Sequence, residues 1–294
     1  MGILNVIKPV GMTSHDVVSY LRRLTGMRRI GHTGTLDPGA AGVLVVCLGR
    51  ATRLVEYLVG YDKRYRVEIT FGQATDTMDG EGQVIASGDA SSIDEQALRR
   101  VAMDFTGQLR QVPPRYSAVK VAGQPAYRRA RRGEPVELPV RQVRVDELRV
   151  LRFWPGEHAR ALLDVRCASG TFVRSLCHDM GEALGCPAHM SFLVRLEVGP
   201  FPISTAQTLA ELAQLGPERL AEVFVDVGEA LPHLPAVAVN QAEAEQICHG
   251  RFLPWAGLTD GQLVRVEDAN QGRLLAIARY HGAQAVLKPE KVLC

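Results

Sequence analysis

The stretch that organises the chain is residues 31–48, which read GHTGTLDPGAAGVLVVCL. Its first part is a loop rich in glycine, a residue that lets a backbone approach a ligand closely. Its second part, Val43–Leu48, is an apolar run typical of a buried strand. Asp37 precedes a proline, which favours an extended backbone at the aspartate. The sequence therefore predicts one carboxylate at the edge of a loop that leads into the core.

Two familiar kinds of site fit this loop poorly. The Gly-Lys-Ser/Thr ending of a nucleoside-triphosphate loop is missing. A metal site at His32 would need further close ligands, and His15, Asp16 and Asp37 match no known ligand spacing. A plainer alternative remains, in which Asp37 orders a turn and His32 is a hydrogen-bonded loop residue.

The segments around this loop mix helices and strands irregularly. Gly2–Ile7 is predicted as a buried strand, and Thr13 or Ser14 as the cap of a helix that runs to Leu24 and stops at Gly26. Further helices are predicted at 50–59, from a capping box of Ser92 and Glu95 to about 105, at 169–184, 208–215 and 217–223, and after Asn240. Further strands are predicted at 64–71, 142–153, 160–167, 191–198, 263–267, 274–280 and 285–287. Because there is no steady βαβ alternation, we expect an α+β protein with a mixed, largely antiparallel sheet flanked by helices.

A proline-rich hinge, Leu231–Pro235, divides the chain. A length of 294 residues suits two domains. We predict one domain over 1–234 and a small β-rich domain over 235–294.

Charge is unevenly distributed along the chain. The net charge is only +2, but residues 1–200 carry 27 basic and 21 acidic residues (+6), and residues 201–294 carry 7 and 11 (−4). The span 110–152 alone holds 11 basic and 4 acidic residues, a balance of +7. This asymmetry indicates a site for a polyanion. The 29 arginines among 34 basic residues suit phosphate binding, although a GC-rich genome would also explain them.

Cysteine usage and hydropathy indicate the compartment. None of the six cysteines is spaced as in a zinc site, so we expect no metal and reduced thiols. There is no leader peptide and no apolar run long enough to span a membrane. We therefore expect a soluble, cytoplasmic protein.

Three features outside the loop could carry chemistry. Arg174 lies in the first turn of a predicted helix, where a cation opposes the helix dipole and needs a partner such as a carboxylate or phosphate. Tyr65, flanked by Lys63 and Arg64, suits base stacking beside phosphate contacts. The segment Arg115–Glu137 interleaves arginines with tyrosines, as in a nucleic-acid grip. The alternatives are a surface arginine, a core tyrosine and a solvated charged helix.

Taken in order, these segments resemble the bacterial tRNA pseudouridine-55 synthase family. The resemblance runs from residue 2 to about 230. Its motifs are KPVGMTS (8–14), GHTGTLDP (31–38), DKRYR (62–66), GQATDT (72–77), YSAVK (116–120), GTFVR (170–174) and GCPAH (185–189).

The resemblance implies an isomerase that flips the T-loop uridine of tRNA, breaks its glycosidic bond and joins C5 to the ribose without a metal or organic cofactor. Asp37 matches the family's catalytic aspartate, which acts as nucleophile or as base. Tyr65 matches the tyrosine that stacks on the flipped base, and Arg174 the arginine that pairs with the aspartate. Phe172 stands where many members carry tyrosine. A glycosidase would need two opposed carboxylates, and the sequence shows no clear second one.

The resemblance also implies how RNA is held. Leu193 matches an apolar wall of the base pocket, His32 the residue that fills the gap left by the flipped nucleotide, and 106–150 an arm that folds over the RNA. The residues expected to contact RNA are Lys8, His32, Lys63, Arg64, Lys120, Arg129, Arg131, Arg132, Phe172 and Leu193. The C-terminal domain resembles the PUA type of RNA-binding domain, more weakly.

The expected partner is tRNA, bound by a monomer with no obligatory protein or guide RNA, because the arm is part of the chain. Two alternatives stay open. One is a pure RNA-binding protein on a synthase scaffold, and the other is a synthase that depends on a guide RNA.

Overall fold

The N-terminal segment forms the predicted strand and helix, in a computed structural model that describes residues 2–117, 119–121, 123–130, 132–135 and 137–294. Strand β1 (Gly2–Lys8) pairs antiparallel with β3 (Ala41–Leu48). Helix α1 (Ser14–Thr25) begins at Thr13, whose side chain accepts a hydrogen bond from the Asp16 amide in a capping box. It ends at Gly26 in the left-handed conformation, at φ 67°. The helix signals in this segment are confirmed.

One large mixed sheet carries most of the chain. Its order is β14-β1-β3-β12-β4-β11-β10-β7, with β13 beside β12 and β2 beside β3. Only the β1–β14 and β3–β12 pairs are parallel, so the predicted α+β class is confirmed. The further strand bounds are β2 Ile30–His32, β4 Lys63–Phe71, β7 Gly107–Gln111, β10 Arg141–Trp154, β11 Arg160–Cys167, β12 Ala188–Val198, β13 Phe201–Pro202 and β14 Gln207–Thr208.

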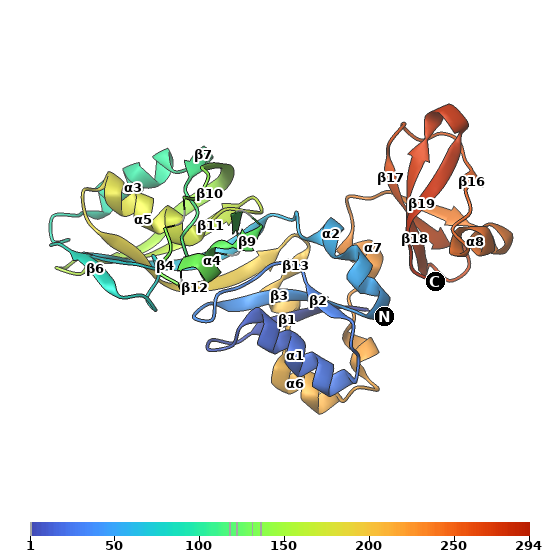
Figure 1. Cartoon of the computed structure of the whole chain (residues 1–294), viewed down its shortest axis with the longest axis horizontal. Coiled ribbons are helices and arrows are strands. Elements are labelled where there is room, and N and C mark those ends of the chain that lie inside the picture. The colour runs from blue at the N-terminus through green and yellow to red at the C-terminus, as the bar shows by residue number, and fades with distance from the viewer. Residues whose placement is uncertain (1, 118, 122, 131, 136) are drawn as a thin grey trace.

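The two halves of this sheet are covered differently. Helices α3 (Glu95–Asp104) and α5 (Val173–Ala183) cover one face of the half that contains β4 (Figure 1). Strands β1 and β3 are instead covered on both faces. One face meets α1 and α6 (Leu209–Leu215), and the other meets the C-terminal part of the chain. Burial on both faces explains why Val43–Leu48 is apolar throughout rather than alternating.

Gly42 allows β3 and β12 to approach at the junction between these halves. It lies opposite Arg195 in the parallel pair, at φ 108°. A Cβ on Gly42 would collide with the Arg195 backbone. The glycine therefore permits the contact that brings the loop before β3 beside β12.

A separate five-stranded sheet follows, in the order β15-β17-β18-β19-β16 (Figure 1). Leu274, Ile277 and Leu293 of this part pack into the core formed with Val43 and Val45 of β3. The bounds are β15 Ala236–Val239, α8 Gln241–Cys248, β16 Leu253–Pro254, β17 Leu263–Asp268, β18 Leu274–His281 and β19 Val286–Val292.

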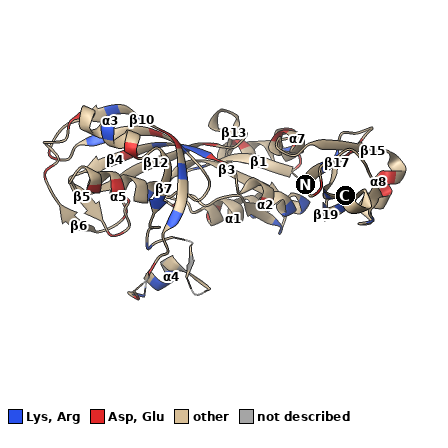
Figure 2. Ribbon diagram, turned by 90° about the horizontal axis from the view of Figure 1, so that it is seen from above, with Lys and Arg blue, Asp and Glu red and all other residues tan. Residues whose placement is uncertain are grey.

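The arm segment leaves the body of the molecule. Figure 2 shows α4 (Ala126–Ala130) projecting away from the large sheet. It follows the short hairpin of β8 (Lys120–Val121) and β9 (Gln124–Pro125). The remaining elements are the hairpin β5 (Gln73–Thr75) and β6 (Val84–Ser87), helices α2 (Val55–Leu58) and α7 (Val227–Ala230), and four 3₁₀ turns at Gly49–Leu54, Ile203–Thr205, Leu220–Val223 and Gly282–Gln284.

Four local predictions are wrong. The helix expected from Ser92 is capped by Asp94, whose carboxylate accepts from the Ala97 amide. The helix expected over 50–59 is a 3₁₀ turn followed by one α-helical turn, the helix expected over 217–223 is a 3₁₀ turn at Leu220–Val223, and the helix expected from 169 begins at Val173. These differences arise because several polar residues near a helix start compete as caps.

The expectation that all thiols are reduced is also wrong. Cys248, at the end of α8, forms a disulfide with Cys294, 46 residues later. Cys47, Cys167, Cys177 and Cys186 are free and buried. Spacing could not predict this pair, because β19 and the residues after it bring the two cysteines together only in the folded chain.

Candidate active site

A cavity of about 720 Å³ opens between the two halves of the large sheet. Six of the residues that the sequence singled out line it, and they come from the loop after β2, from β4, from the start of α5 and from β12. They are His32, Asp37, Tyr65, Phe172, Arg174 and Leu193. Folding thus brings together residues up to 161 positions apart (193 minus 32).

The loop that carries Asp37 is fastened on both sides of that residue. The Leu36 amide donates to the Ser14 hydroxyl at 2.8 Å, and the same hydroxyl donates to the Leu36 carbonyl at 3.2 Å. The Pro38 carbonyl accepts from the Gly11 amide at 2.9 Å. Asp37 therefore projects from a fixed backbone, with 41% of its side chain exposed at the cavity.

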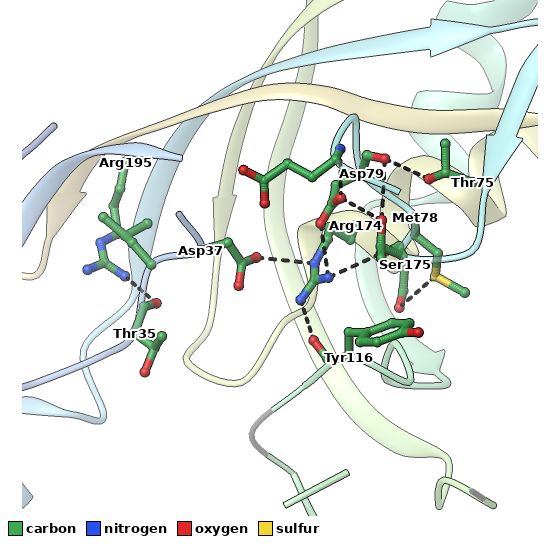
Figure 3. A network of polar contacts seen from close by, with 12 residues as sticks. Thr35, Asp37, Thr75, Met78, Asp79, Tyr116, Arg174, Ser175 and Arg195 are labelled. Carbon is green, nitrogen blue, oxygen red and sulfur yellow. Dashed lines mark hydrogen bonds and ion pairs between the residues drawn. The ribbon is translucent and has the colours of Figure 1, made fainter. Parts of the chain in front are cut away.

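Arg174 is the hub of the polar network in Figure 3. Its Nε lies 3.2 Å from Oδ2 of Asp37, and its Nη1 lies 3.1 Å from Oδ2 of Asp79. It also donates to the carbonyls of Thr77 and Tyr116. Its side chain is only 9% exposed. With every face of the guanidinium engaged, Arg174 has one orientation relative to Asp37.

Asp79 corrects the expectation of a single placed carboxylate. It lies two residues beyond the GQATDT motif, and its side chain is 11% exposed. Its oxygens also accept hydrogen bonds from the Thr77 hydroxyl at 2.6 Å and the Glu81 amide at 3.1 Å. Nothing in its sequence context distinguishes it from a turn residue. Because Arg174 holds both carboxylates, they lie on either side of one cation rather than opposed across a substrate.

The pKa of Asp37 is raised above its ordinary range. Burial by the surrounding protein is the largest cause, and the charge of Asp79 adds to it. Arg174, Lys8 and Arg195 act in the opposite direction. The ionised form of Asp37 therefore depends on these three cations.

The aromatic and apolar side chains form one wall of the cavity. Tyr65 is 8% exposed, and burial raises the pKa of its phenol, so it is neutral near pH 7. Leu193 is 6% exposed on β12, the strand next to β4. Phe172 is held through its backbone, because the Gln111 amide group bonds both its N–H (3.1 Å) and its carbonyl (3.3 Å).

His32 and Lys8 lie on the loop side of the cavity. Burial, together with the charges of Arg195 and His15, lowers the pKa of His32, so its ring is neutral near pH 7. Lys8 is fully buried and does not line the cavity. Its Nζ donates to the carbonyls of Met12 (2.6 Å) and Pro38 (3.3 Å), and burial lowers its pKa to about 8. Lys8 thus fastens the Asp37 loop from below.

The structure does not bring the other predicted RNA contacts to the cavity. Lys63 is 7% exposed, and its Nζ donates to the Val59 carbonyl and the Ser169 hydroxyl, each at 2.9 Å. Arg64 leaves β4 on the face opposite Tyr65 and pairs with Asp164. Contact of either residue with RNA stays a prediction.

The arm residues lie away from the cavity. Arg129 and Arg132 both pair with Glu134, at 3.0 and 3.7 Å. Arg131 and the side chain of Lys120 lie outside the described residues. Figure 2 shows basic residues along β10 and on α4.

Two further searches concern the described part of the chain. There, no three His, Cys, Asp or Glu side chains gather as a metal site would require. No helix described is long and apolar enough to cross a membrane.

Comparison with known proteins identifies relatives over nearly the whole chain. Residues 22–173 match the N-terminal domain of TruB family pseudouridylate synthase, and residues 174–231 match the C-terminal domain of tRNA pseudouridylate synthase B. The chain is 47% identical to tRNA pseudouridine synthase B of Pelotomaculum thermopropionicum, covering 94% of this chain and 90% of the relative. It is 42% identical to the protein of that name from Caldanaerobacter subterraneus subsp. tengcongensis, covering 99% and 98%.

Two solved structures share the fold over 100% of this chain and 85% of theirs. One is an H/ACA RNP bound to a substrate RNA containing 2′-deoxyuridine, with 27% identity and a TM-score of 0.74. The other is a Cbf5-Nop10-Gar1 complex, with 28% identity and a TM-score of 0.75.

Proposed function

The chain belongs to the TruB family of pseudouridylate synthases and isomerises uridine to pseudouridine in tRNA, and we propose that its target is the T-loop uridine, position 55, with Asp37 as the catalytic carboxylate. The observation that supports this assignment is the ion pair of Asp37 with Arg174 inside a cavity lined by Tyr65 and Leu193.

The reaction conserves all atoms of the nucleotide. The N1–C1′ bond breaks, the base turns over, C5 bonds to C1′, and the proton on C5 is lost while N1 gains one. Asp37 starts this either by attacking C1′ or by taking a ribose proton, and both routes need its ionised form. Its exposed oxygen, on the cavity side, is available for either route.

Arg174 keeps Asp37 reactive when RNA covers the cavity. Bound RNA removes water from the carboxylate, which by itself would raise the pKa of Asp37 further. The adjacent guanidinium opposes that shift. Asp79 and the carbonyls of Thr77 and Tyr116 hold the guanidinium in place without drawing on Asp37.

The aromatic wall receives the flipped base. Flipping costs a few kcal/mol of stacking energy, and stacking on a protein ring returns about 1–3 kcal/mol per base. Tyr65 offers that ring, with Leu193 beside it and Phe172 at the entrance. His32, neutral and at the cavity edge, fills the space that the nucleotide leaves.

The remaining parts of the chain hold the rest of the tRNA. We assign residues 1–234 to catalysis, with 106–150 as the arm that closes over the RNA, and 235–294 to a PUA-like RNA-binding domain. The protein acts in the cytoplasm as a monomer. The projection of α4 from the chain's own fold supports action without a guide RNA.

The experiment uses a T-arm hairpin and the full-length tRNA transcript. Wild type is expected to form pseudouridine at position 55 of both, mapped by mass spectrometry, with no added protein or guide RNA. Asp37→Asn is expected to bind RNA with unchanged affinity and to form none. Turnover by Asp37→Asn would remove the catalytic assignment, and a requirement for a guide RNA would favour the mode suggested by the ribonucleoprotein neighbours.

A further inference from the structure

Arg195 is a buried arginine beneath the cavity that no motif singled out. It lies two residues after Leu193 on β12, on the same side of the strand, and is 2% exposed. Among the described residues no carboxylate lies within ion-pair distance of its guanidinium. Instead, Nε donates to the Val43 carbonyl at 2.7 Å, Nη2 to Gly34 at 3.0 Å and Nη1 to Thr35 at 3.4 Å.

These three acceptors belong to two different segments. Val43 is in β3, whereas Gly34 and Thr35 lie in the loop, three and two residues before Asp37. The planar fork of one guanidinium therefore ties the loop to the sheet (Figure 3). Ser14, Gly11 and Lys8 hold the loop at Leu36 and Pro38, so Arg195 is the anchor on its other side.

The cost of burying this cation indicates that it does more than fill the core. An arginine without a carboxylate is expensive to bury and is rarely found so. Burial lowers the pKa of Arg195, while the Tyr65 hydroxyl and Asp37 raise it. Arginine nevertheless stays charged near pH 7. The molecule thus keeps a fixed positive charge under the loop.

We infer that Arg195 is a positioning residue of the reaction, which sets the backbone from which Asp37 reaches the target ribose and supplies a positive charge beneath the carboxylate. This inference rests on the proposed role of Asp37. It assigns to Arg195 a task distinct from that of Arg174, which contacts the carboxylate itself.

The charged groups that face Asp37 come from several elements. Arg174 of α5, Lys8 of β1 and Arg195 of β12 are the cations, and Asp79, on the turn after β5, is the nearest anion. Further titratable groups line the same cavity, namely His15, His32, Tyr65 and Glu81. Removing the Arg195 charge therefore raises the pKa of Asp37 further, whereas replacing it by lysine keeps the charge and loses the fork.

The test compares Arg195→Lys and Arg195→Met in single-turnover assays on the T-arm hairpin across pH. A misplaced reacting group costs about 100-fold in rate, so both variants are expected to lose about that much in kcat while RNA affinity stays within about threefold. The acid limb of the rate profile should move to higher pH in Arg195→Met only, because only that variant loses the charge.

Asn5→Ala is the matched control. Asn5 is also 2% exposed in the large sheet and donates to a backbone carbonyl, that of Pro202, far from the loop. It is expected to lower the melting temperature with no change in kcat or in the acid limb.

The outcomes separate the two proposals. An active Asp37→Asn would remove the role of Asp37 itself. With Asp37→Asn inactive, wild-type kcat in both Arg195 variants, or an acid limb unmoved in Arg195→Met, would overturn the role of Arg195. If neither variant folds, Arg195→Gln takes their place. Failure of all three to fold beside a folded Asn5→Ala would assign Arg195 to sheet stability alone.

Discussion

Strand β4 carries an aspartate–arginine cluster near each of its faces, and the two clusters differ in how completely the carboxylate is paired. On one face, Asp164 is 2% exposed, and each of its oxygens accepts from a different arginine, Arg64 at 2.8 Å and Arg66 at 2.9 Å. On the Tyr65 face, Asp37 is 41% exposed and has one oxygen engaged, at 3.2 Å. A fully paired carboxylate is inert, whereas a half-paired one keeps an oxygen for chemistry.

The largest expected effect contrasts these two carboxylates directly. Asp37→Asn should abolish pseudouridine formation and raise the melting temperature at pH 7. Its folded-state pKa is raised, so stability falls as pH rises from the unfolded value through the folded one, and the ionised form destabilises the fold at pH 7. The neutral amide removes that penalty.

Asp164→Asn is the counterpart. It should lower the free energy of unfolding by about 1–3 kcal/mol, because two arginines lose a charged acceptor, and leave kcat of the folded enzyme unchanged. Thermal melts and single-turnover rates measure both variants. A destabilised Asp37→Asn or an inactive Asp164→Asn would break the contrast.

A smaller effect is expected at Asp79, which holds Arg174 from the side away from Asp37. Asp79→Asn should lower kcat by about 10- to 100-fold, the worth of a charge-assisted hydrogen bond, with little change in RNA affinity. Asp76→Asn is the control, because Asp76 lies in the same turn but bonds the Gln83 amide instead. Equal losses in both variants would attribute the effect to the turn rather than to Arg174.

The arm offers a third kind of arginine, exposed and only loosely paired. Replacing Arg129, Arg131 and Arg132 by alanine should weaken tRNA binding and reduce the slope of log K against log salt by about 1–2, since each phosphate contact contributes about 0.9. Arg219→Ala, which breaks a similar surface pair with Glu222, should leave the slope unchanged. An unaltered slope in the triple variant would show that the arm does not contact phosphate.

The smallest effect is expected at Phe172. Phe172→Tyr adds a hydroxyl that many family members carry, yet Gln111 already fixes the backbone here. We expect kcat to change by less than about threefold, which is below 1 kcal/mol. A larger gain in kcat would show that the hydroxyl has a role that stacking does not replace.

Much of the site could be predicted because its parts are local. Helix caps, the turn at Gly26 and the apolar run Val43–Leu48 are short-range signals, and the structure confirms them. The motifs around Asp37, Tyr65 and Arg174 identified the family, and the cavity collects all three residues. Asp79 and Arg195 carried no such signal, because each acts through partners more than 90 residues away.

The sequence by itself determined the class of fold, the family and the identity of the carboxylate, since periodicity, caps and motifs are written in neighbouring residues. Only the tertiary structure decided which charges meet. It moved Lys63 and Arg64 away from the cavity, paired Cys248 with Cys294, and set Arg174 and Arg195 on either side of the Asp37 loop. The physical reason is that a charge is defined by its partners and its burial, and both arise only when distant strands pack together.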